Sequence, residues 1–250
     1  MSPRLRRWET NPAGAIAPPP FRPPPPDLEL AALLDRYAPF QPVALCPSIS
    51  TYHARSLVRI WEVAEELAGA ELPAPFWAYP WAAGAALARA ILDEPERVRG
   101  RRVIDFGTGG GIVAIAAAKA GAADIVANDV DPWALAVARL AARRQGFFVR
   151  LLCADLTAMA EEATAWDVLL CSDLGYERSV APAQRRLLER ARTAGVDVIV
   201  ADAGRTYFDA TGLRTIAEHT LRVPLDLEGV ATRTARVYTM PKPRPRRRQD

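Results

Sequence analysis

The sequence is poor in histidine, cysteine and lysine, and these shortages exclude several kinds of site. It has two histidines, three cysteines and two lysines among 250 residues. Two histidines are too few for a histidine-rich metal centre, and the cysteines lack the paired CxxC spacing of zinc sites. Cys46, Cys153 and Cys171 are typical of reduced thiols in a cytoplasmic protein. We therefore expect a cytoplasmic protein without disulfides and without a bound metal.

Long apolar runs and a net basic field are also missing. No apolar run approaches the roughly 18 residues that a membrane helix needs, and the N-terminus is proline-rich where a secretory signal would be apolar. The formal net charge is +3, but the last ten residues hold five basic side chains against one acid, so the rest of the chain is close to neutral. We expect neither a membrane nor a nucleic acid as a partner.

The composition along the chain predicts four segments. A proline-rich leader covers 1–26 and a basic tail covers 241–250, and both are expected to be disordered. Between them lie a helical and cover segment at 27–95 and a cofactor-binding domain at 96–240. Within the cover segment the pattern predicts helices at 28–38, 56–68 and 82–92, a loop or short strand at 42–54, and an aromatic, proline-containing stretch at 72–81.

From residue 102 onward, short apolar runs alternate with helical patterns. The runs predict strands at 102–106, 124–128, 147–153, 166–171 and 196–201, with helices at 112–120, 132–145, 180–193 and 209–219 and further strands at 221–227 and 233–240. Nearly continuous apolar strands are typical of a parallel sheet that is covered on both faces. The pattern therefore predicts the α/β class, with a doubly wound, seven-stranded, mostly parallel sheet and an N-terminal helical extension.

A cluster of glycines follows the first of these strands, in the stretch VIDFGTGGG at 103–111. It matches in full the pattern Asp-x-Gly-x-Gly-x-Gly of S-adenosylmethionine (SAM) methyltransferases, through Asp105, Gly107, Gly109 and Gly111. Glycines let the backbone turn sharply and approach a ligand closely, and the helix that begins next adds unpaired N–H groups. The loop is therefore a candidate binding site for a small cofactor.

A dinucleotide site is the competing interpretation of the same loop. Gly109, Gly111 and Ala114 satisfy the permissive form G-x-G-x-x-G/A, and Asp129 follows Gly109 by 20 residues. The acid before the glycines favours the methyl donor, because a carboxylate at Asp105 would repel a pyrophosphate and would suit the ammonium of a methionine moiety. We therefore predict SAM as the cofactor, with an NAD-dependent oxidoreductase as the alternative.

Acidic residues follow four successive predicted strands. Besides Asp105, these are Asp129, which suits two ribose hydroxyls, Asp155, which suits an adenine amino group, and Asp173. Ligands of open α/β sheets bind beyond the carboxyl ends of the strands, so we expect these acids to line one crevice. Asp131 is expected to cap the next helix instead. For Asp155, a plain loop acid is the alternative.

At these residues the sequence resembles the lysine methyltransferases of the electron-transfer flavoprotein β-subunit, which belong to the seven-β-strand class I methyltransferases. The resemblance runs roughly over 42–240, and its specific parts are FWAYPWAAG at 76–84, the glycine loop, ANDVDP at 127–132 and Asp173-x-x-Tyr176. It implies SAM as cofactor and a protein lysine as methyl acceptor, with the flavoprotein β-subunit as the first candidate substrate.

The resemblance also implies roles for particular residues. Asp173 and Tyr176 are implied to be catalytic, by holding the substrate lysine and shaping its channel, and the aromatic segment ending in Trp81 is implied to cover the cofactor. Cofactor binding is assigned to Trp81, Asp105, Gly107, Gly109, Gly111, Asp129, Asp155 and Ser172. Because a carboxylate raises the pKa of a neighbouring amine, Asp173 is expected to aim the amine rather than deprotonate it, and Trp77, Trp81 and Tyr176 are expected to exclude water from it.

Other substrates and classes remain open at this point. The stretch 113–139 also resembles methyltransferases of large-subunit ribosomal proteins, and Gly175 stands where the flavoprotein family has a bulkier residue. A ribosomal-protein lysine and a small-molecule amine are alternative acceptors. A SAM-binding module without catalysis is the alternative from a different class.

Overall fold

The computed structural model describes residues 22–159, 164–176 and 178–241. Within them, seven strands form one sheet in the order β5-β4-β3-β6-β7-β9-β8. Its strands are β3 (Arg102–Phe106), β4 (Asp124–Asp129), β5 (Arg150–Cys153), β6 (Val168–Ser172), β7 (Asp197–Asp202), β8 (Arg214–Arg222) and β9 (Thr232–Thr239). The first five are parallel, and β9 runs antiparallel to both β7 and β8. The predicted doubly wound, seven-stranded, mostly parallel sheet is confirmed.

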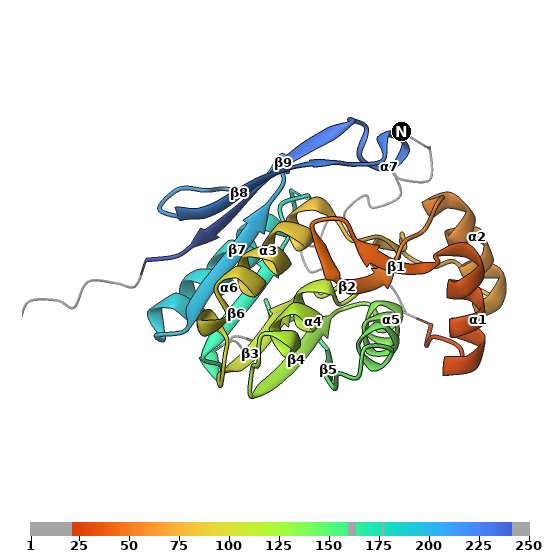
Figure 1. Ribbon diagram of the computed structural model, residues 1–250, viewed down its shortest axis with the longest axis horizontal. Coiled ribbons are helices and arrows are strands. Elements are labelled where there is room, and N and C mark those ends of the chain that lie inside the picture. Colours follow the sequence, from red (N-terminus) through yellow and green to blue (C-terminus); the bar gives the residue numbers. More distant parts are fainter. Residues whose placement is uncertain (1–21, 160–163, 177, 242–250) are drawn as a thin grey trace, which may run out of the picture.

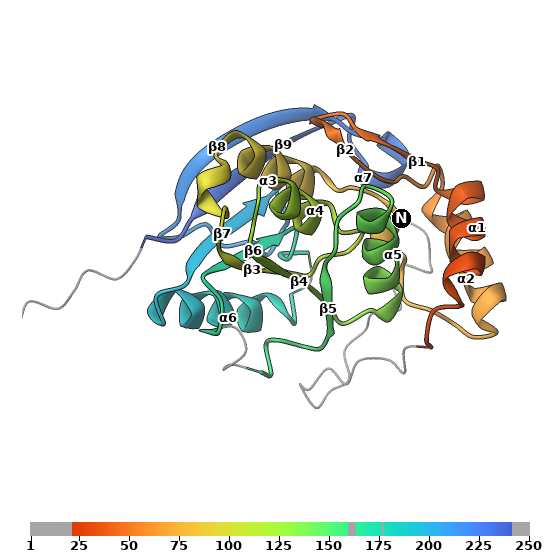
Figure 2. The same ribbon diagram turned by 60° about the horizontal axis from the view of Figure 1, so that its bottom comes forward.

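Helices cover both faces of this sheet (Figure 2). The helices α3 (Ala82–Asp93), α4 (Ile112–Lys119) and α5 (Pro132–Arg143) lie on one face, and α6 (Ala181–Thr193) lies on the other. Successive strand residues alternate between the two layers: Val103 packs in the core under α3 and α4, and Ile104 packs in the core under α6. Burial on both faces is the reason that these strands are apolar at nearly every position.

The N-terminal segment adds two helices and a hairpin (Figure 1). They are α1 (Asp27–Tyr37), α2 (Leu57–Ala68), and the antiparallel strands β1 (Phe40–Val43) and β2 (Cys46–Tyr52). The hairpin occupies the stretch for which the sequence predicted a loop or short strand. Asp27 of α1 pairs with Arg139 and Arg143 of α5. These contacts attach the extension to the sheet domain.

Residues 209–222 correct the sequence prediction. The predicted helix at 209–219 is wrong, because β8 begins at Arg214 after a turn at Gly212. The strand predicted at 221–227 is correct only at its start, because β8 ends at Arg222 and the short helix α7 (Leu225–Glu228) follows. In the described part of the chain, β8 is an edge strand that pairs with β9 alone. An edge strand leaves many side chains exposed, so its sequence lacks the apolar density of the inner strands.

The predicted leader and tail lie largely outside the described residues. Of the leader, Arg22 accepts a hydrogen bond at 3.0 Å through its carbonyl from the indole N–H of Trp133, which is 1% exposed. No helix in the described part of the chain is long and apolar enough to cross a membrane.

Candidate active site

The glycine loop is braced from below by Asp105, at the end of β3. This carboxylate is 1% exposed, and its Oδ2 accepts hydrogen bonds from the Thr108 hydroxyl at 2.6 Å and the Ala114 N–H at 3.1 Å. Burial raises the pKa of Asp105 to about 7, although the two hydrogen bonds oppose the shift. The described contacts make Asp105 a brace for the turn, and its contact with a methionine ammonium stays a prediction.

Asp129, at the end of β4, reaches back to the same loop. Its Oδ2 accepts the Gly109 N–H at 2.9 Å, and its Oδ1 accepts the Asp131 N–H at 3.1 Å. Gly109 has a left-handed φ of 51°, and the space where a Cβ would stand is open. Burial raises the pKa of Asp129. The half-buried carboxylate of Asp129 thus lies next to Gly109, where the loop has open space beside it. Asp131 caps α5 by accepting the Trp133 N–H at 2.8 Å, as the sequence predicted.

The loop also meets the two other predicted parts of the site. A Cβ on Gly107 would stand 2.9 Å from Leu174, next to Asp173, and a Cβ on Gly110 would stand 2.7 Å from the carbonyl oxygen of Trp77. Only glycine allows approaches this close. The aromatic segment and the motif after β6 therefore both contact the glycine loop.

The aromatic segment divides into a buried and an exposed part. Trp77, in the 3₁₀ helix Phe76–Ala78, is 3% exposed and stacks on Trp133, with ring centroids 6.1 Å apart. Trp81 is only partly buried, and its indole N–H donates to the Phe76 carbonyl at 2.7 Å. Tyr176 is 51% exposed, and its ring lies 5.5 Å from that of Phe76. Trp77 is thus a core residue, whereas Trp81 and Tyr176 remain accessible to a ligand.

Two further predicted cofactor residues lie at strand ends. Asp155 follows β5. Its Oδ1 accepts hydrogen bonds from the backbone N–H of Thr157 at 2.9 Å and from the Thr157 hydroxyl at 2.7 Å. These bonds form a turn, which is the loop-acid role that the sequence left open, and an adenine contact stays a prediction. Ser172 ends β6 and is half-buried, and a Cβ on Gly84 of α3 would stand 3.4 Å from its hydroxyl oxygen.

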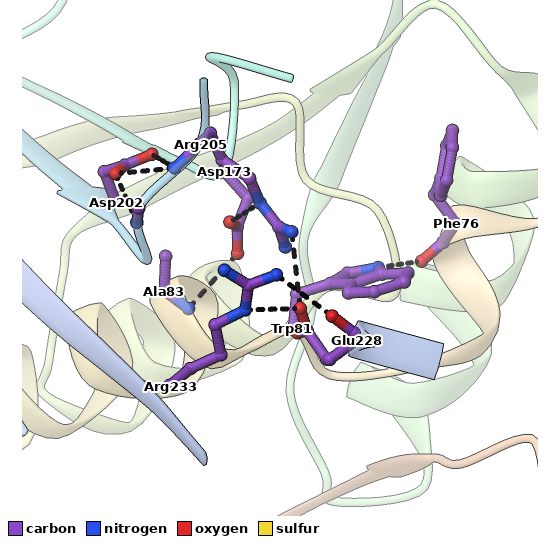
Figure 3. A network of polar contacts seen from close by, with 9 residues as sticks. Phe76, Trp81, Ala83, Asp173, Asp202, Arg205, Glu228 and Arg233 are labelled. Atoms are coloured by element: carbon purple, nitrogen blue, oxygen red, sulfur yellow. Dashed lines mark hydrogen bonds and ion pairs between the residues drawn. The ribbon is translucent and has the colours of Figure 1, made fainter. Parts of the chain in front are cut away.

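Asp173 is held by two donors beyond the end of β6 (Figure 3). Its Oδ2 accepts the Ala83 N–H of α3 at 3.1 Å, and its Oδ1 accepts the Arg205 Nε–H at 2.6 Å. Asp173 is the only non-glycine among the described residues with a positive φ, 54°. Non-glycine residues adopt this conformation rarely, and it is found often at functional sites. Burial raises the pKa of Asp173, and the charge of Arg205 opposes the shift.

Known methyltransferases resemble this chain in sequence over a large part of its length. A family model described as ribosomal protein L11 methyltransferase (PrmA) matches residues 86–174. The electron transfer flavoprotein β-subunit lysine methyltransferase of Danio rerio is 34% identical over 172 residues, which are 68% of this chain and 66% of that protein. The Rattus norvegicus enzyme of the same name is 32% identical over 169 residues, 66% of each chain. Over the matched residues this chain is thus similar to the electron transfer flavoprotein β-subunit lysine methyltransferases.

The match to this family spans just under two thirds of the length of these relatives. A solved structure, that of SMU.776 complexed with SAH, agrees in fold at a TM-score of 0.50 and 11% identity, and covers 77% of this chain and 54% of that one. The likeness to this solved structure is one of fold.

The described residues fit SAM, the cofactor of class I methyltransferases. Asp129 would offer its carboxylate oxygens to ribose hydroxyls beside the open position at Gly109, and Asp105 accepts a hydrogen bond from Thr108 of the loop. Both acids lie on the β3–β4 side of the sheet, while Asp173 follows β6 on the other side of β3. The donor and acceptor groups of a methyl transfer would thus meet where the strand order reverses.

The sequence interpretation missed Arg205 and its neighbours. The Arg205 backbone N–H donates to Asp202 at the end of β7, its guanidinium lies 5.5 Å from the Trp81 ring centroid, and its Nη1 is 3.3 Å from Glu228 Oε2. The acid-after-strand pattern that identified Asp173 applies equally to Asp202 and would have located this turn. For Glu228 the sequence offers no comparable signal, because it ends the short helix α7, between the antiparallel strands β8 and β9, and does not follow a parallel strand.

Proposed function

We propose that this protein is a cytoplasmic SAM-dependent methyltransferase that methylates a protein lysine and does not act on nucleic acid. The flavoprotein β-subunit is the first candidate substrate. The observation that carries the proposal is the pairing of two half-sites across the switch point of the sheet. Asp129 and the glycine loop lie on one side, and Asp173 lies on the other.

The residues of this chain would orient and desolvate the reacting amine. When bound, SAM supplies an electrophilic methyl group on a positive sulfonium. The acceptor lysine must lose a proton, which at pH 7 costs about 4–5 kcal/mol from a free pKa near 10.4. Asp173 holds and aims the amine, and it raises the pKa of the amine rather than lowering it.

Arg205 opposes that effect of Asp173, because a neighbouring cation favours the neutral form of an amine. Trp81 and Tyr176 exclude water from the approach, and the proton leaves to solvent. Alignment of the two reactants accounts for much of the rate, roughly 7–11 kcal/mol by effective-molarity arguments.

A large-subunit ribosomal protein is the second candidate substrate. The specific observation in its favour is the match of residues 86–174 to the L11 methyltransferase model. The two substrates are separated by incubating the enzyme and tritiated SAM with recombinant flavoprotein β-subunit, with ribosomal protein L11, or with n-butylamine. Label in the β-subunit alone supports the first candidate.

Cofactor choice is tested separately by thermal unfolding. S-adenosylhomocysteine (SAH), the demethylated cofactor, at 100 times its Kd should stabilise the protein by about 2.7 kcal/mol. This corresponds to a rise in Tm of roughly 5–10 °C for a chain of this size. NAD is the control and should produce no comparable rise. A rise with NAD and none with SAH would favour the oxidoreductase.

A further inference from the structure

A cluster of charged side chains that includes Asp173 lies where strands β6 and β7 end (Figure 3). Asp173 follows β6, Asp202 ends β7, and Glu228 lies just before β9, which contributes Arg233. Because β9 is antiparallel to β7, its start lies at the edge where β6 and β7 end. With its carboxylates ionised, the cluster has three negative charges against the two positive charges of Arg205 and Arg233. It therefore suits one additional cation.

Glu228 has an unused acceptor inside this cluster. Its side chain is 0% exposed, and its Oε2 faces both guanidiniums, with Arg205 Nη1 at 3.3 Å and Arg233 Nε at 3.2 Å. The other oxygen, Oε1, is buried and has no hydrogen-bond partner among the residues that the structure describes. Buried carboxylate oxygens are costly to leave unpaired. An N–H donor from outside the chain would remove this cost.

The unused oxygen belongs to the acceptor half of the site. Arg205 connects Glu228 directly to Asp173 and lies over the Trp81 ring. Tyr79, in the aromatic segment, also lies near Glu228: burial raises the pKa of Tyr79 to about 12, and the charge of Glu228 adds to the shift. None of these contacts involves Asp129 or the glycine loop.

We propose that Glu228 Oε1 binds the amino group of the acceptor lysine, as a second carboxylate beside Asp173. This inference rests on the proposed lysine methylation. Arg205 and Arg233 hold the opposite oxygen, so Oε1 keeps its capacity to accept an N–H donor. Glu228 thereby contributes to acceptor binding and not to donor binding.

Glu228→Gln tests this role selectively. The two guanidiniums donate to the Oε2 position, so the amide must direct its oxygen there and place its NH₂ at the Oε1 position. The substitution thus replaces the free acceptor with a donor that repels an amine. Glu218→Gln is the matched control, because Glu218 is an exposed glutamate of β8 that accepts from the Arg236 Nε at 2.5 Å.

The measurements are kcat/KM for recombinant flavoprotein β-subunit with tritiated SAM, and the Kd of SAH by calorimetry. We expect Glu228→Gln to lower kcat/KM at least about tenfold, the loss typical of a hydrogen bond to a charged group, while the SAH Kd stays within twofold. Glu218→Gln should match wild type in both. If Glu228→Gln does not fold, Glu228→Asp keeps the charge for both arginines but withdraws the free oxygen, and it should show the same selective loss.

Two results would overturn the inference while leaving the proposed function intact. One is an unchanged kcat/KM in a folded variant, and the other is an equal loss of SAH affinity and acceptor turnover, which would indicate a structural role. Failure of wild-type enzyme to label any lysine acceptor would instead overturn the proposed function, and this inference with it.

Discussion

The carboxylate of Asp173 accepts a 2.6 Å hydrogen bond from Nε of Arg205, which lies 32 residues later in the chain. Both side chains are largely buried, at 11% and 17% exposure, and Arg205 also contacts Glu228. A buried arginine thus compensates two carboxylates, one of which is the residue assigned to aim the acceptor amine. The pair links the stability of this part of the fold to the geometry of the site.

Removing Arg205 should destabilise the protein strongly. Arg205→Ala leaves Asp173 without its ionic partner, and breaking a buried ion pair from one side typically costs about 3–5 kcal/mol. Chemical denaturation measures the loss. Arg236→Ala is the control, because Arg236 pairs with Glu218 at the exposed surface and its loss should leave stability near wild type. Equal stability of the two variants would contradict a role for the buried pair.

Asp173→Asn should separate chemistry from cofactor binding. The amide keeps the shape of the side chain but loses the charge that we propose holds the acceptor amine. We expect SAH affinity close to wild type and a loss of methyl transfer of about tenfold or more, since hydrogen bonds to charged groups contribute about 1.5–3 kcal/mol. Transfer at the wild-type rate would refute the role assigned to Asp173.

Asp129→Ala should have the opposite pattern and weaken SAH binding. The substitution removes the acceptor for the Gly109 and Asp131 N–H groups as well as the predicted ribose contact. A loss of about 1–3 kcal/mol, roughly tenfold to a hundredfold in Kd, is expected from unpaired polar groups. Titration calorimetry with SAH measures it, and unchanged affinity would remove Asp129 from the cofactor site.

Trp81→Ala and Trp77→Ala form a matched pair. Trp77 is buried against Trp133, so its truncation should cost about 3–5 kcal/mol of stability. Trp81 is partly exposed, so its truncation should affect folding less and should weaken SAH binding by about 1–3 kcal/mol if its ring covers the donor. Unfolding midpoints and SAH affinities, measured on both variants, test the contrast. A large stability loss with unchanged affinity for Trp81→Ala would make that residue structural.

Asp105→Asn should change how stability depends on pH. The carboxylate has a folded pKa of about 7, above the unfolded value near 3.9, so the native state binds the extra proton between these limits. Wild-type stability should therefore fall as pH rises from about 4 to 7, by about 1.4 kcal/mol per pH unit from this group, and level off above.

In Asp105→Asn this contribution should be absent. The amide oxygen can accept from both Thr108 and Ala114, because in wild type both donors bind one oxygen, Oδ2. Urea denaturation of both proteins from pH 4 to 8 compares the slopes. Parallel curves would show that Asp105 ionises normally in the folded protein.

Most of the fold could be predicted because the burial of the inner strands is visible in the residue types of those strands themselves. A strand such as β3, buried on both faces, must be apolar at nearly every position, and the glycine loop that follows it is a local backbone requirement. The prediction was wrong at 209–219, where β8 lies at the sheet edge with many exposed side chains. Whether such a mixed stretch forms a helix or a strand depends on β9, a partner that lies outside the stretch.

For the site, the sequence by itself determined which acids follow the strands, since a strand end and the residue after it are neighbours in the chain. Asp105, Asp129 and Asp173 were predicted in this way, and parallel pairing brings them to one edge. Only the tertiary structure decided that Trp77 is core while Trp81 is accessible, and that Arg205 and Glu228 join Asp173. Burial and ion pairing depend on which distant segments pack together, and that is a property of the folded chain as a whole.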